Sequence, residues 1–397
     1  MEKTMMILGA SALQVPAIKK AKEMGYKIIL VDYDENAVGF PLADIKLVVS
    51  TLDQDEVYRQ ALIYQPDVVI TSTSDGPVRT AAYVNEKLGK KPDLSYEDSL
   101  CATIKSHMRN RLKENNVPIP EYYAVSDFDG FLEAVDKLNG HCIVKPADNA
   151  GSRGVVLVET KDNNELKNIY EYSMGNSRNG TLMVEEFMSG AEVSVEAMTV
   201  NGETQIITIT DKYITPPPYF VELAHCEPSM LDDNIQKQIR AVALQAVKVI
   251  KLQNGPSHTE IKVTKDGPKV VELAARLGGD FITSRLVPLS TGIDMVGASV
   301  ELAAGERVNI ERKCSRGAAI HFIQAKEGVI KEISVPDEVY DLSGVEEVVI
   351  YKKVGDTVHG IKSSNDRIGH VITSADTPKE AMETGRQILE MISILIG

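Results

Sequence analysis

Two acidic residues, Glu260 and Glu272, lie in a stretch that can fold into a β-hairpin and bring them face to face. The turn of this hairpin would be Lys265-Asp266-Gly267, with the glycine in the left-handed conformation. The resulting register gives three cross-strand pairs: Glu260–Glu272, Ile261–Val271 and Lys262–Val270. Because side chains alternate along a strand, the two acids share one face. The other face is apolar and consists of Ile261, Val263, Val271 and Leu273.

Two carboxylates in direct opposition destabilise a hairpin, so we expect a cation between them. Hard oxygen ligands without Cys or clustered His favour Mg²⁺ or Mn²⁺, and Mg²⁺ is commonly held by one or two carboxylates plus substrate phosphates. Arg276 follows Glu272 by four residues and would suit a transferring phosphate. The hairpin therefore indicates nucleotide-dependent chemistry. A register slipped by one residue would instead separate the acids on opposite solvent edges.

A second chemical feature is Lys145, which ends the apolar strand Cys142–Lys145 and precedes a loop of small residues. The central residues of the loop are Gly151, Ser152, Arg153 and Gly154. Small side chains let backbone N–H groups approach a polyphosphate closely, and the lysine adds a positive charge. The segment is not a P-loop, because no Gly-Lys-Ser/Thr opens a helix. A plain hairpin turn is the alternative.

Composition and charge exclude several classes of protein. The chain has 397 residues, 43% of them hydrophobic and 25% charged, which is typical of soluble globular proteins with two to four domains. A net charge of −14 disfavours a general binder of nucleic acids or anionic membranes. No stretch approaches about eighteen consecutive apolar residues, so we expect no membrane span. The four cysteines form no CxxC pair and indicate reduced thiols in the cytoplasm.

Roughly the first ninety residues alternate short apolar strands with helices. The expected strands are Thr4–Gly9, Lys27–Asp32, Lys46–Ser50 and Asp67–Thr71. This alternation predicts a doubly wound parallel sheet that binds ligands at the carboxyl ends of its strands. Gly9-x-Ser11 lacks the second and third glycines of a dinucleotide fingerprint, which disfavours an oxidoreductase. Asp32, at a strand end, is equally well explained as a turn or capping acid.

The remaining chain mixes helices with antiparallel strands. A polar helix over Ser99–Asn115 is expected to carry solvated basic residues, including Arg109. The long helix Asp232–Lys251 has an apolar stripe that should face a core. The segment from Arg316 should form short strands and a final helix, Thr377–Ile396.

In the order of its motifs along the sequence, the chain resembles the ATP-grasp superfamily of carboxylate ligases from end to end. The matching pieces are Ile104-Lys105-Ser106, Val144-Lys145-Pro146, Val184-Glu185-Glu186-Phe187-Met188, Glu260, Glu272 and Arg276. The tail Asp366–Ile372 looks like the C-terminal domain of the biotin carboxylase and phosphoribosylglycinamide synthetase branches. The resemblance implies an α/β ATP-grasp fold: an N-terminal doubly wound domain (1–95), an ATP-grasp domain with a central antiparallel sheet (96–310) and a small C-terminal α+β domain (311–397). Residues of about 118–187 would form a mobile α+β lid.

The resemblance also implies a role for each matching residue. Lys105 and Lys145 would contact the ATP phosphates, and the loop containing Gly151, Ser152, Arg153 and Gly154 would close over them. Glu185 would accept a hydrogen bond from the adenine amino group, and Glu186, Phe187 and Met188 would form the hinge. Glu192 would bind the ribose, Glu260 and Glu272 would hold Mg²⁺ or Mn²⁺, and Arg276 would stabilise the acyl phosphate. Ala274 departs from the superfamily, which usually has Asn there, so the second metal ion would be held more weakly.

The function implied is ATP-dependent ligation of a carboxylate to an amine through an acyl phosphate, with release of ADP and phosphate. An amino acid or similar small carboxylate is favoured, because the Gly9-Ala10-Ser11 turn offers only part of a phosphate site. Phosphoribosylamine–glycine ligation, a biotin carboxylase-type component, a nucleotide-binding protein without catalysis and an NAD-dependent oxidoreductase remain alternatives. Small molecules are the expected partners, without nucleic acid or membrane, and a homodimer is left open.

Overall fold

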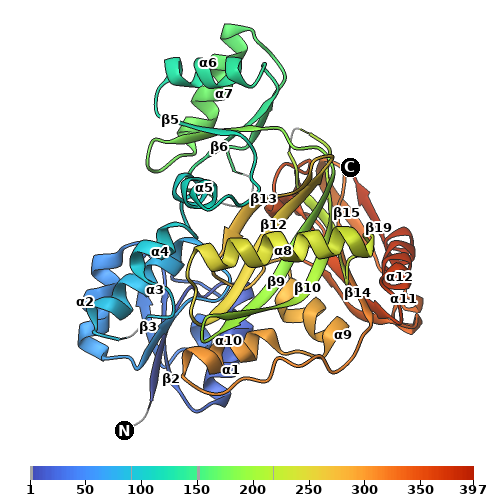
Figure 1. Cartoon of the computed structure of the whole chain (residues 1–397). Helices are drawn as coiled ribbons and strands as arrows, with labels where there is room; N and C mark the ends of the chain where they lie inside the picture. The colour runs from blue at the N-terminus through green and yellow to red at the C-terminus, as the bar shows by residue number, and fades with distance from the viewer. Residues whose placement is uncertain (1–2, 91, 150–152, 218) are drawn as a thin grey trace.

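The computed structural model describes residues 3–90, 92–149, 153–217 and 219–397. Figure 1 shows an N-terminal domain beside a broad central sheet, with a separate small lid above both and the C-terminal segment on the far side of the sheet. The molecule therefore consists of an N-terminal α/β domain, a small lid and a broad central sheet.

The N-terminal domain is a parallel sheet with strand order β3-β2-β1-β4. Its strands are β1 (Thr4–Leu8), β2 (Lys27–Asp32), β3 (Ile45–Val48) and β4 (Val68–Ile70). The helices are α1 (Val15–Glu23), α2 (Gln54–Tyr64) and α3 (Gly76–Lys87), with short helical turns at Ala12–Gln14 and Phe40–Leu42. Apolar side chains on both faces of β1 and β2 are fully buried, as the near-continuous hydrophobic runs predicted. The loops after β1 and β4 consequently lie at the same edge of the sheet.

One helix predicted from the sequence is wrong. In place of a single helix over Ser99–Asn115, the chain forms α4 (Tyr96–Leu100) and α5 (Lys105–Glu114). Ile104 separates them in an extended conformation, with φ −128° and ψ 114°. Lys105 therefore stands at the first turn of a new helix, and α5 is not a solvated element, because Arg109, Met108 and Leu112 are buried in it.

The lid is a four-stranded antiparallel sheet with order β5-β8-β6-β7, backed by two helices. Its strands are β5 (Tyr122–Val125), β6 (Cys142–Pro146), β7 (Val156–Val158) and β8 (Leu182–Glu186), and its helices are α6 (Phe128–Lys137) and α7 (Asn163–Gly175). Figure 1 shows α6 and α7 on the outer side of the lid. Phe131, Val144 and Val184 belong to a core of its own. The helices therefore leave the inner side of the lid sheet free to line the candidate site.

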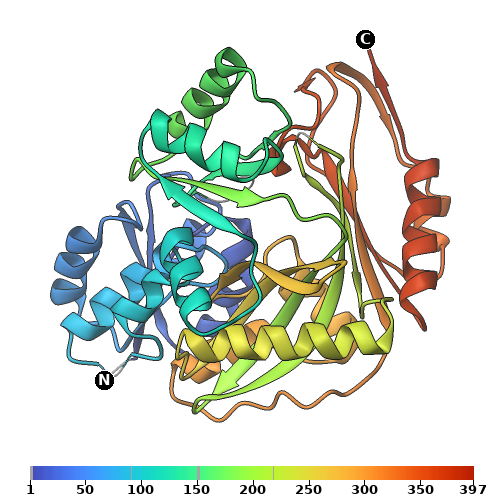
Figure 2. The ribbon, with the colours of Figure 1, turned by 45° about the horizontal axis from the view of Figure 1, so that its top comes forward.

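The central sheet has eight strands, in the order β13-β12-β9-β10-β11-β14-β18-β16. The strands are β9 (Ala191–Val200), β10 (Glu203–Ile214), β11 (Glu222–Glu227), β12 (Gly255–Thr264), β13 (Gly267–Ala274), β14 (Gly317–Ile323), β16 (Val345–Ile350) and β18 (Gly369–Ala375). Figure 2 shows α8 (Asp233–Val249) lying along one face. Its predicted stripe enters the core through Ile239, Val242 and Ala246. The opposite face is covered by α9 (Val287–Thr291) and α10 (Met295–Ala303), which follow a π-helical turn, Ile282–Leu286.

The C-terminal segment adds β14, β16 and β18 to the central sheet and forms a second, three-stranded sheet. Its remaining elements are β15 (Gly328–Ser334), α11 (Glu338–Asp341), β17 (Thr357–Val358), the turn Ser364–Asp366, α12 (Pro378–Met391) and β19 (Ser393–Ile396). The prediction of a helix up to Ile396 is wrong, because α12 ends at Met391 and β19 pairs with β15. Pairing with β15 buries part of the apolar tail, which helix propensity alone would have continued.

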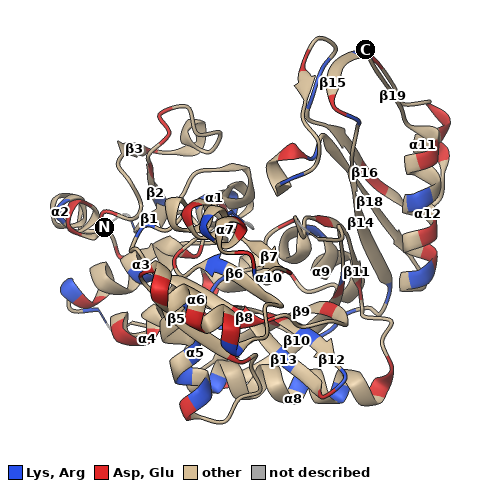
Figure 3. Cartoon of the chain, turned by 90° about the horizontal axis from the view of Figure 1, so that it is seen from above, with Lys and Arg blue, Asp and Glu red and all other residues tan. Residues whose placement is uncertain are grey.

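Figure 3 shows both acidic and basic side chains along α12, whereas α8 carries mainly basic ones after its first residue. In the described part of the chain, no single helix is long and apolar enough to cross a membrane. Only the bent pair Ile282–Thr291 and Met295–Ala303 meets the length and composition criterion jointly. Both helices of this pair contribute buried residues to the hydrophobic core.

Candidate active site

The hairpin β12–β13 places Glu260 directly opposite Glu272, as predicted. Beyond this pair the predicted register is wrong: Ile261 pairs with Val270, and Lys262 with Lys269. The reason is a β-bulge, in which Val271 is an extra residue without a partner on β12. The turn is also shorter than predicted, because Thr264 already pairs with Gly267. Gly267 has the positive φ expected of it, +107°.

The bulge changes which side chains face the site. Val270 and Leu273 are buried in the core, whereas Val271 and Glu272 both line the large pocket between lid and sheet. The prediction that Val271 faces the core is therefore wrong. The extra residue turns the strand so that Glu272 keeps its position opposite Glu260, while the segment before it shifts by one residue.

The pocket gathers most of the predicted site residues. Its empty volume is about 930 Å³, including open solvent at the mouth. Predicted site residues in its lining are Lys105, Lys145, Arg153, Glu185, Glu186, Phe187, Met188, Glu192, Glu260 and Glu272. Gly154 lies close to Pro146, within the loop that follows β6. Gly151 and Ser152 lie outside the described residues.

Each of the opposed acids is paired with a lysine. Lys105 Nζ lies 2.7 Å from Glu272 Oε1, and Lys212 Nζ lies 2.7 Å from Glu260 Oε1. Burial alone would lower the pKa of Lys105, but the charge of Glu272 and its hydrogen bond raise it overall. The expected cation between two like charges thus takes the form of two ammonium groups, one on each acid. Both lysines are protonated at neutral pH and can turn to phosphate oxygens.

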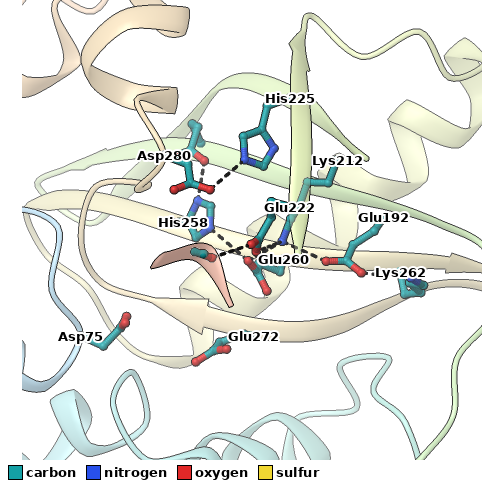
Figure 4. A network of polar contacts seen from close by, with 12 residues as sticks. Asp75, Glu192, Lys212, Glu222, His225, His258, Glu260, Lys262, Glu272 and Asp280 are labelled. Carbon is teal, nitrogen blue, oxygen red and sulfur yellow. Dashed lines mark hydrogen bonds and ion pairs between the residues drawn. The ribbon is translucent and has the colours of Figure 1, made fainter. Parts of the chain in front are cut away.

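Lys212 was missed by the sequence reasoning. It lies near the end of β10, two residues beyond the strand Gln205–Thr210 that the sequence predicts, and its side chain is only 3% exposed. Its Nζ also contacts Glu192 Oε1 at 2.9 Å and Glu222 at 3.7 Å, and Figure 4 shows this cluster. The burial of Lys212 would lower its pKa, but the three surrounding carboxylates raise it well above the ordinary value. The predicted ribose acid and the predicted metal acid are thereby joined through one lysine.

Glu185 lies at the centre of a second charged cluster. Its carboxylate is 2.7 Å from Lys145 Nζ and accepts hydrogen bonds from Arg109 Nε at 2.8 Å and Arg109 Nη2 at 3.0 Å. Burial would raise the pKa of Glu185, but the charges of Arg109 and Lys145 lower it to about 2. Glu185 thus stands between two cations, and its adenine contact stays a prediction.

The hinge after β8 connects lid and sheet. Glu186 accepts hydrogen bonds from Lys269 Nζ at 3.0 and 2.9 Å, and its backbone N–H donates to the carbonyl of Glu121. Phe187 packs edge-on against His141, with ring centroids 4.9 Å apart. The hinge segment therefore presents Phe187 and Met188 to the pocket, with the acid of Glu186 engaged elsewhere.

Arg276 is not among the residues that line the pocket. Its Nε and Nη2 donate to the carboxylate of Asp75 at 2.7 and 3.1 Å, and Asp75 belongs to the N-terminal domain, just before α3. The neighbouring backbone N–H of Leu277 donates to Ser72 O at 3.0 Å. The loop after β4 is thus joined to the end of the metal-acid hairpin, which places the N-terminal domain beside the site.

A buried histidine lies behind Glu260. His258 Nδ1 is 2.5 Å from Glu196 Oε1, and its Nε2 is 3.6 Å from Glu260 Oε1. Burial would lower the pKa of His258, but Glu196 raises it to about 9. Ala274, the position that departs from the superfamily, pairs with His258 across the hairpin. The region where an Asn oxygen is usual is therefore occupied by an alanine beside a protonated imidazole.

The C-terminal segment also reaches this region. Arg367 donates two hydrogen bonds of 2.7 Å to Asp280, whose Oδ2 lies 3.3 Å from His225 Nε2. Ser364 Oγ donates to Glu222 at 3.1 Å. Figure 4 shows His225 and Asp280 adjacent to the cluster around Glu260. Sequence reasoning gave none of these residues a role, because their partners are distant in sequence.

The carboxylates of Glu260 and Glu272 are the proposed ligands of Mg²⁺. The described residues contain no group of three or more His, Cys, Asp or Glu side chains that could hold a metal. Glu260 and Glu272 supply hard carboxylate oxygens at opposed positions, and Mg²⁺ in nucleotide sites usually needs only one or two carboxylates because phosphates and water complete the shell. The chemistry of this pair fits an ion that arrives with a nucleotide.

Comparison with known proteins agrees with this geometry. Residues 138–284 match the ATP-grasp domain family, and residues 321–397 match the L-amino acid ligase C-terminal domain 2. The chain is 28% identical over 293 residues to the uncharacterized protein y4rH of Sinorhizobium fredii, covering 72% of this chain and 60% of that protein. It is 25% identical over 305 residues to an L-arginine-specific L-amino acid ligase of Bacillus subtilis, covering 75% and 72%.

A solved L-amino acid ligase from Bacillus licheniformis superposes with a TM-score of 0.84 at 22% identity, over 100% of this chain and 99% of that one. Other matching proteins include phosphoribosylamine–glycine ligases and biotin carboxylases. The paired acids, the phosphate-side lysines, the lid and the family matches agree with one another. Residues 138–284 belong to the ATP-grasp domain family, and residues 321–397 belong to the L-amino acid ligase C-terminal domain 2 family.

Proposed function

We propose that this protein is an ATP-dependent ligase that joins a carboxylate to an amine through an acyl phosphate. The observation that carries the proposal is the opposition of Glu260 and Glu272 at a pocket that also contains Lys105 and Lys145. Acids suited to Mg²⁺ and lysines suited to phosphate are the groups that phosphoryl transfer requires. The family matches support the same reaction class.

The proposed orientation of ATP follows from the distribution of charge. The adenine lies at the hinge segment Glu186–Met188, where Phe187 and Met188 contribute apolar side chains to the pocket lining. Glu192 binds the ribose. Its carboxylate gives up its contacts with Lys212 and Lys262 and accepts hydrogen bonds from the ribose hydroxyl groups instead. The phosphates point toward Lys105 and Lys145, and the loop with Arg153 and Gly154 covers them.

Mg²⁺ bound with ATP would be held by Glu260 and Glu272 and would neutralise charge on the transferring phosphate. The residues of the chain do the remaining work. Lys105 and Lys145 leave their carboxylate partners to bind phosphate oxygens, and the lid excludes water from the reacting groups. Arg276 would stabilise the acyl phosphate once a substrate carboxylate competes with Asp75 for its guanidinium. No protein nucleophile is needed, because the substrate carboxylate attacks phosphorus directly.

We propose an amino acid or similar small carboxylate as the substrate. The loop after β1 in the N-terminal domain disfavours a phosphoribosyl group. There Asp32 Oδ2 already accepts the N–H of Ala10 at 2.7 Å, and its negative charge opposes a phosphate. Phosphoribosylamine–glycine ligation is the second candidate, favoured by relatives of that name. A biotin carboxylase-type component and a nucleotide-binding protein without catalysis are further candidates.

The experiment is a phosphate-release screen in which carboxylates are crossed with amines in the presence of Mg²⁺ and ATP. The proposal expects release of phosphate and ADP only when an amino acid and an amine are both present. Phosphate release with phosphoribosylamine and glycine alone would establish the second candidate. Absence of turnover with every pair, together with tight ATP binding, would favour the nucleotide-binding protein.

A further inference from the structure

Arg109 is a guanidinium with no exposed surface, four residues after Lys105 on α5. Residues at this spacing lie on the same face of a helix, so Arg109 points to the same side as the phosphate lysine. A buried arginine is rare unless its donors are all paired. Its partners therefore indicate what the residue is for.

Two of the oxygen atoms that accept hydrogen bonds from Arg109 belong to the lid, and two belong to the hairpin. Arg109 Nε and Nη2 donate to the two carboxylate oxygens of Glu185 at 2.8 and 3.0 Å. Arg109 Nη1 donates to Val270 O at 3.1 Å, and Nη2 donates to Val271 O at 2.8 Å. One side chain thus connects strand β8 with the bulge of β13.

The hairpin contacts lie next to a predicted metal ligand. β13 is an edge strand of the central sheet, so the carbonyls on its free side have no neighbouring strand. Val271 is the bulge residue and directly precedes Glu272. The guanidinium of Arg109 binds the carbonyl oxygens of Val270 and Val271. These bonds fix the bulge that turns Glu272 toward the pocket.

The lid contacts affect the charge of Lys145. Lys145 Nζ lies 2.7 Å from Glu185, and both side chains are buried, so a pair without a further cation would be neutral toward a phosphate. Arg109 adds a second positive charge to the same carboxylate. The group of three then carries a net positive charge, which leaves Lys145 as an effective phosphate ligand.

We propose that Arg109 is a positioning residue for the nucleotide: it neutralises Glu185 so that the charge of Lys145 acts on phosphate, and it holds the Val271 bulge that aims Glu272. The inference rests on the proposed function, in which Lys145 binds ATP phosphates. It predicts an unusual dependence of ATP affinity on Glu185, since that acid should weaken ATP binding once Arg109 is gone.

The ATP affinities of two variants, measured by calorimetry with Mg²⁺ and compared with that of the wild type, test the charge argument. Arg109→Met should weaken ATP binding by about tenfold or more, the loss expected of a charged contact. Adding Glu185→Gln to this variant removes the unpaired acid and should restore most of the affinity. A purely structural role predicts the reverse, because the double variant loses still more buried contacts. Failure of the double variant to recover would overturn the inference.

Controls separate this inference from the proposed function. Arg111→Met removes a guanidinium from the same helix, whose partner Asp98 lies outside the pocket lining, and ATP affinity should not change. Lys145→Met should weaken ATP binding by itself. Wild-type affinity in that variant would overturn the role of Lys145 and the inference with it. A weakened Lys145→Met together with an unrecovered double variant would overturn only the inference.

If Arg109→Met does not fold, as judged by circular dichroism and melting temperature, Glu185→Gln alone carries the test. In that variant Arg109 and Lys145 lose their counter-ion, so ATP binding should tighten or stay equal. The amide oxygen still accepts a hydrogen bond, so an adenine contact is retained. Weakening by about tenfold would contradict the inference, because the negative charge of Glu185 would then support ATP binding and not offset the charge of Lys145.

Discussion

Glu260 and Glu272 face each other across β12 and β13, and each is 2.7 Å from the ammonium group of a different lysine. Lys105 comes from the first turn of α5, and Lys212 comes from the end of β10. The two ion pairs alternate in charge around the pocket. A nucleotide with its metal ion can exchange both pairs at once, because phosphates take the lysines and the ion takes the acids.

Glu272→Gln should abolish ATP turnover and leave the fold intact. The change removes a proposed metal ligand and relieves the repulsion between opposed acids. Turnover at saturating ATP and a titration with Mg²⁺ would be measured together with the melting temperature. Asp266→Asn, on the exposed turn of the same hairpin, is the matched control and should turn over ATP normally. Normal turnover in Glu272→Gln would exclude the metal assignment.

Lys145→Met should weaken ATP binding or slow turnover by roughly 1.5–3 kcal/mol, the value of a charge-assisted contact. The melting temperature should change little, because Arg109 still holds both oxygens of Glu185. Lys161→Met, on the exposed surface of the lid, should behave like wild type. A large loss of stability with intact ATP affinity would show that Lys145 serves packing instead.

Glu227 should make stability fall as pH rises from about 5 to 8. It is buried and accepts hydrogen bonds from Thr210 and Ser290, and burial raises its pKa to about 8. The folded protein then binds a proton that the unfolded chain has lost, so the stabilisation present below the unfolded pKa of 4.5 disappears as pH passes 8. His258, with a pKa of about 9, adds a loss in the same direction at higher pH.

Chemical denaturation of Glu227→Gln at pH 5, 6.5 and 8 measures the contribution of Glu227 to the pH dependence of the free energy of unfolding. The amide stays neutral, so the decline in the free energy of unfolding over this range should be smaller than in wild type. Glu203→Gln, on the exposed end of β10, should keep the full decline. An unchanged decline in Glu227→Gln would mean that Glu227 is ionised in the folded protein.

Much of the fold follows from local pattern. Apolar runs and helix signals in the first ninety residues suffice for a parallel sheet, because each β-α unit is determined within about thirty residues. The pairing of Glu260 with Glu272 was predicted correctly although the register near the turn was not, because the turn is one residue shorter than predicted and the bulge at Val271 compensates for it. The bulge at Val271 was not predictable, because its carbonyl oxygens bind Arg109, which reaches the hairpin from α5 and is distant in sequence.

The residues missed in the site share one property: their partners are far away in sequence. Lys212, Asp75 and Arg367 each look like surface charges until the fold brings an acid or a guanidinium to them. Arg109 illustrates this most clearly, since a polar helix hides one buried position among exposed ones. Long-range charge pairing has no local signal, whereas strand alternation and turn residues do.

The central claim is that the reaction passes through an acyl phosphate. The carboxylate substrate, labelled with ¹⁸O, would be incubated with the protein, Mg²⁺, ATP and the amine, and the products analysed by mass spectrometry. Attack of the carboxylate on the γ-phosphorus, as the placement of the acid pair with Lys105 and Lys145 favours, transfers label to inorganic phosphate and yields ADP. Label in AMP would instead demonstrate an acyl adenylate and contradict both this mechanism and the proposed role of Arg276.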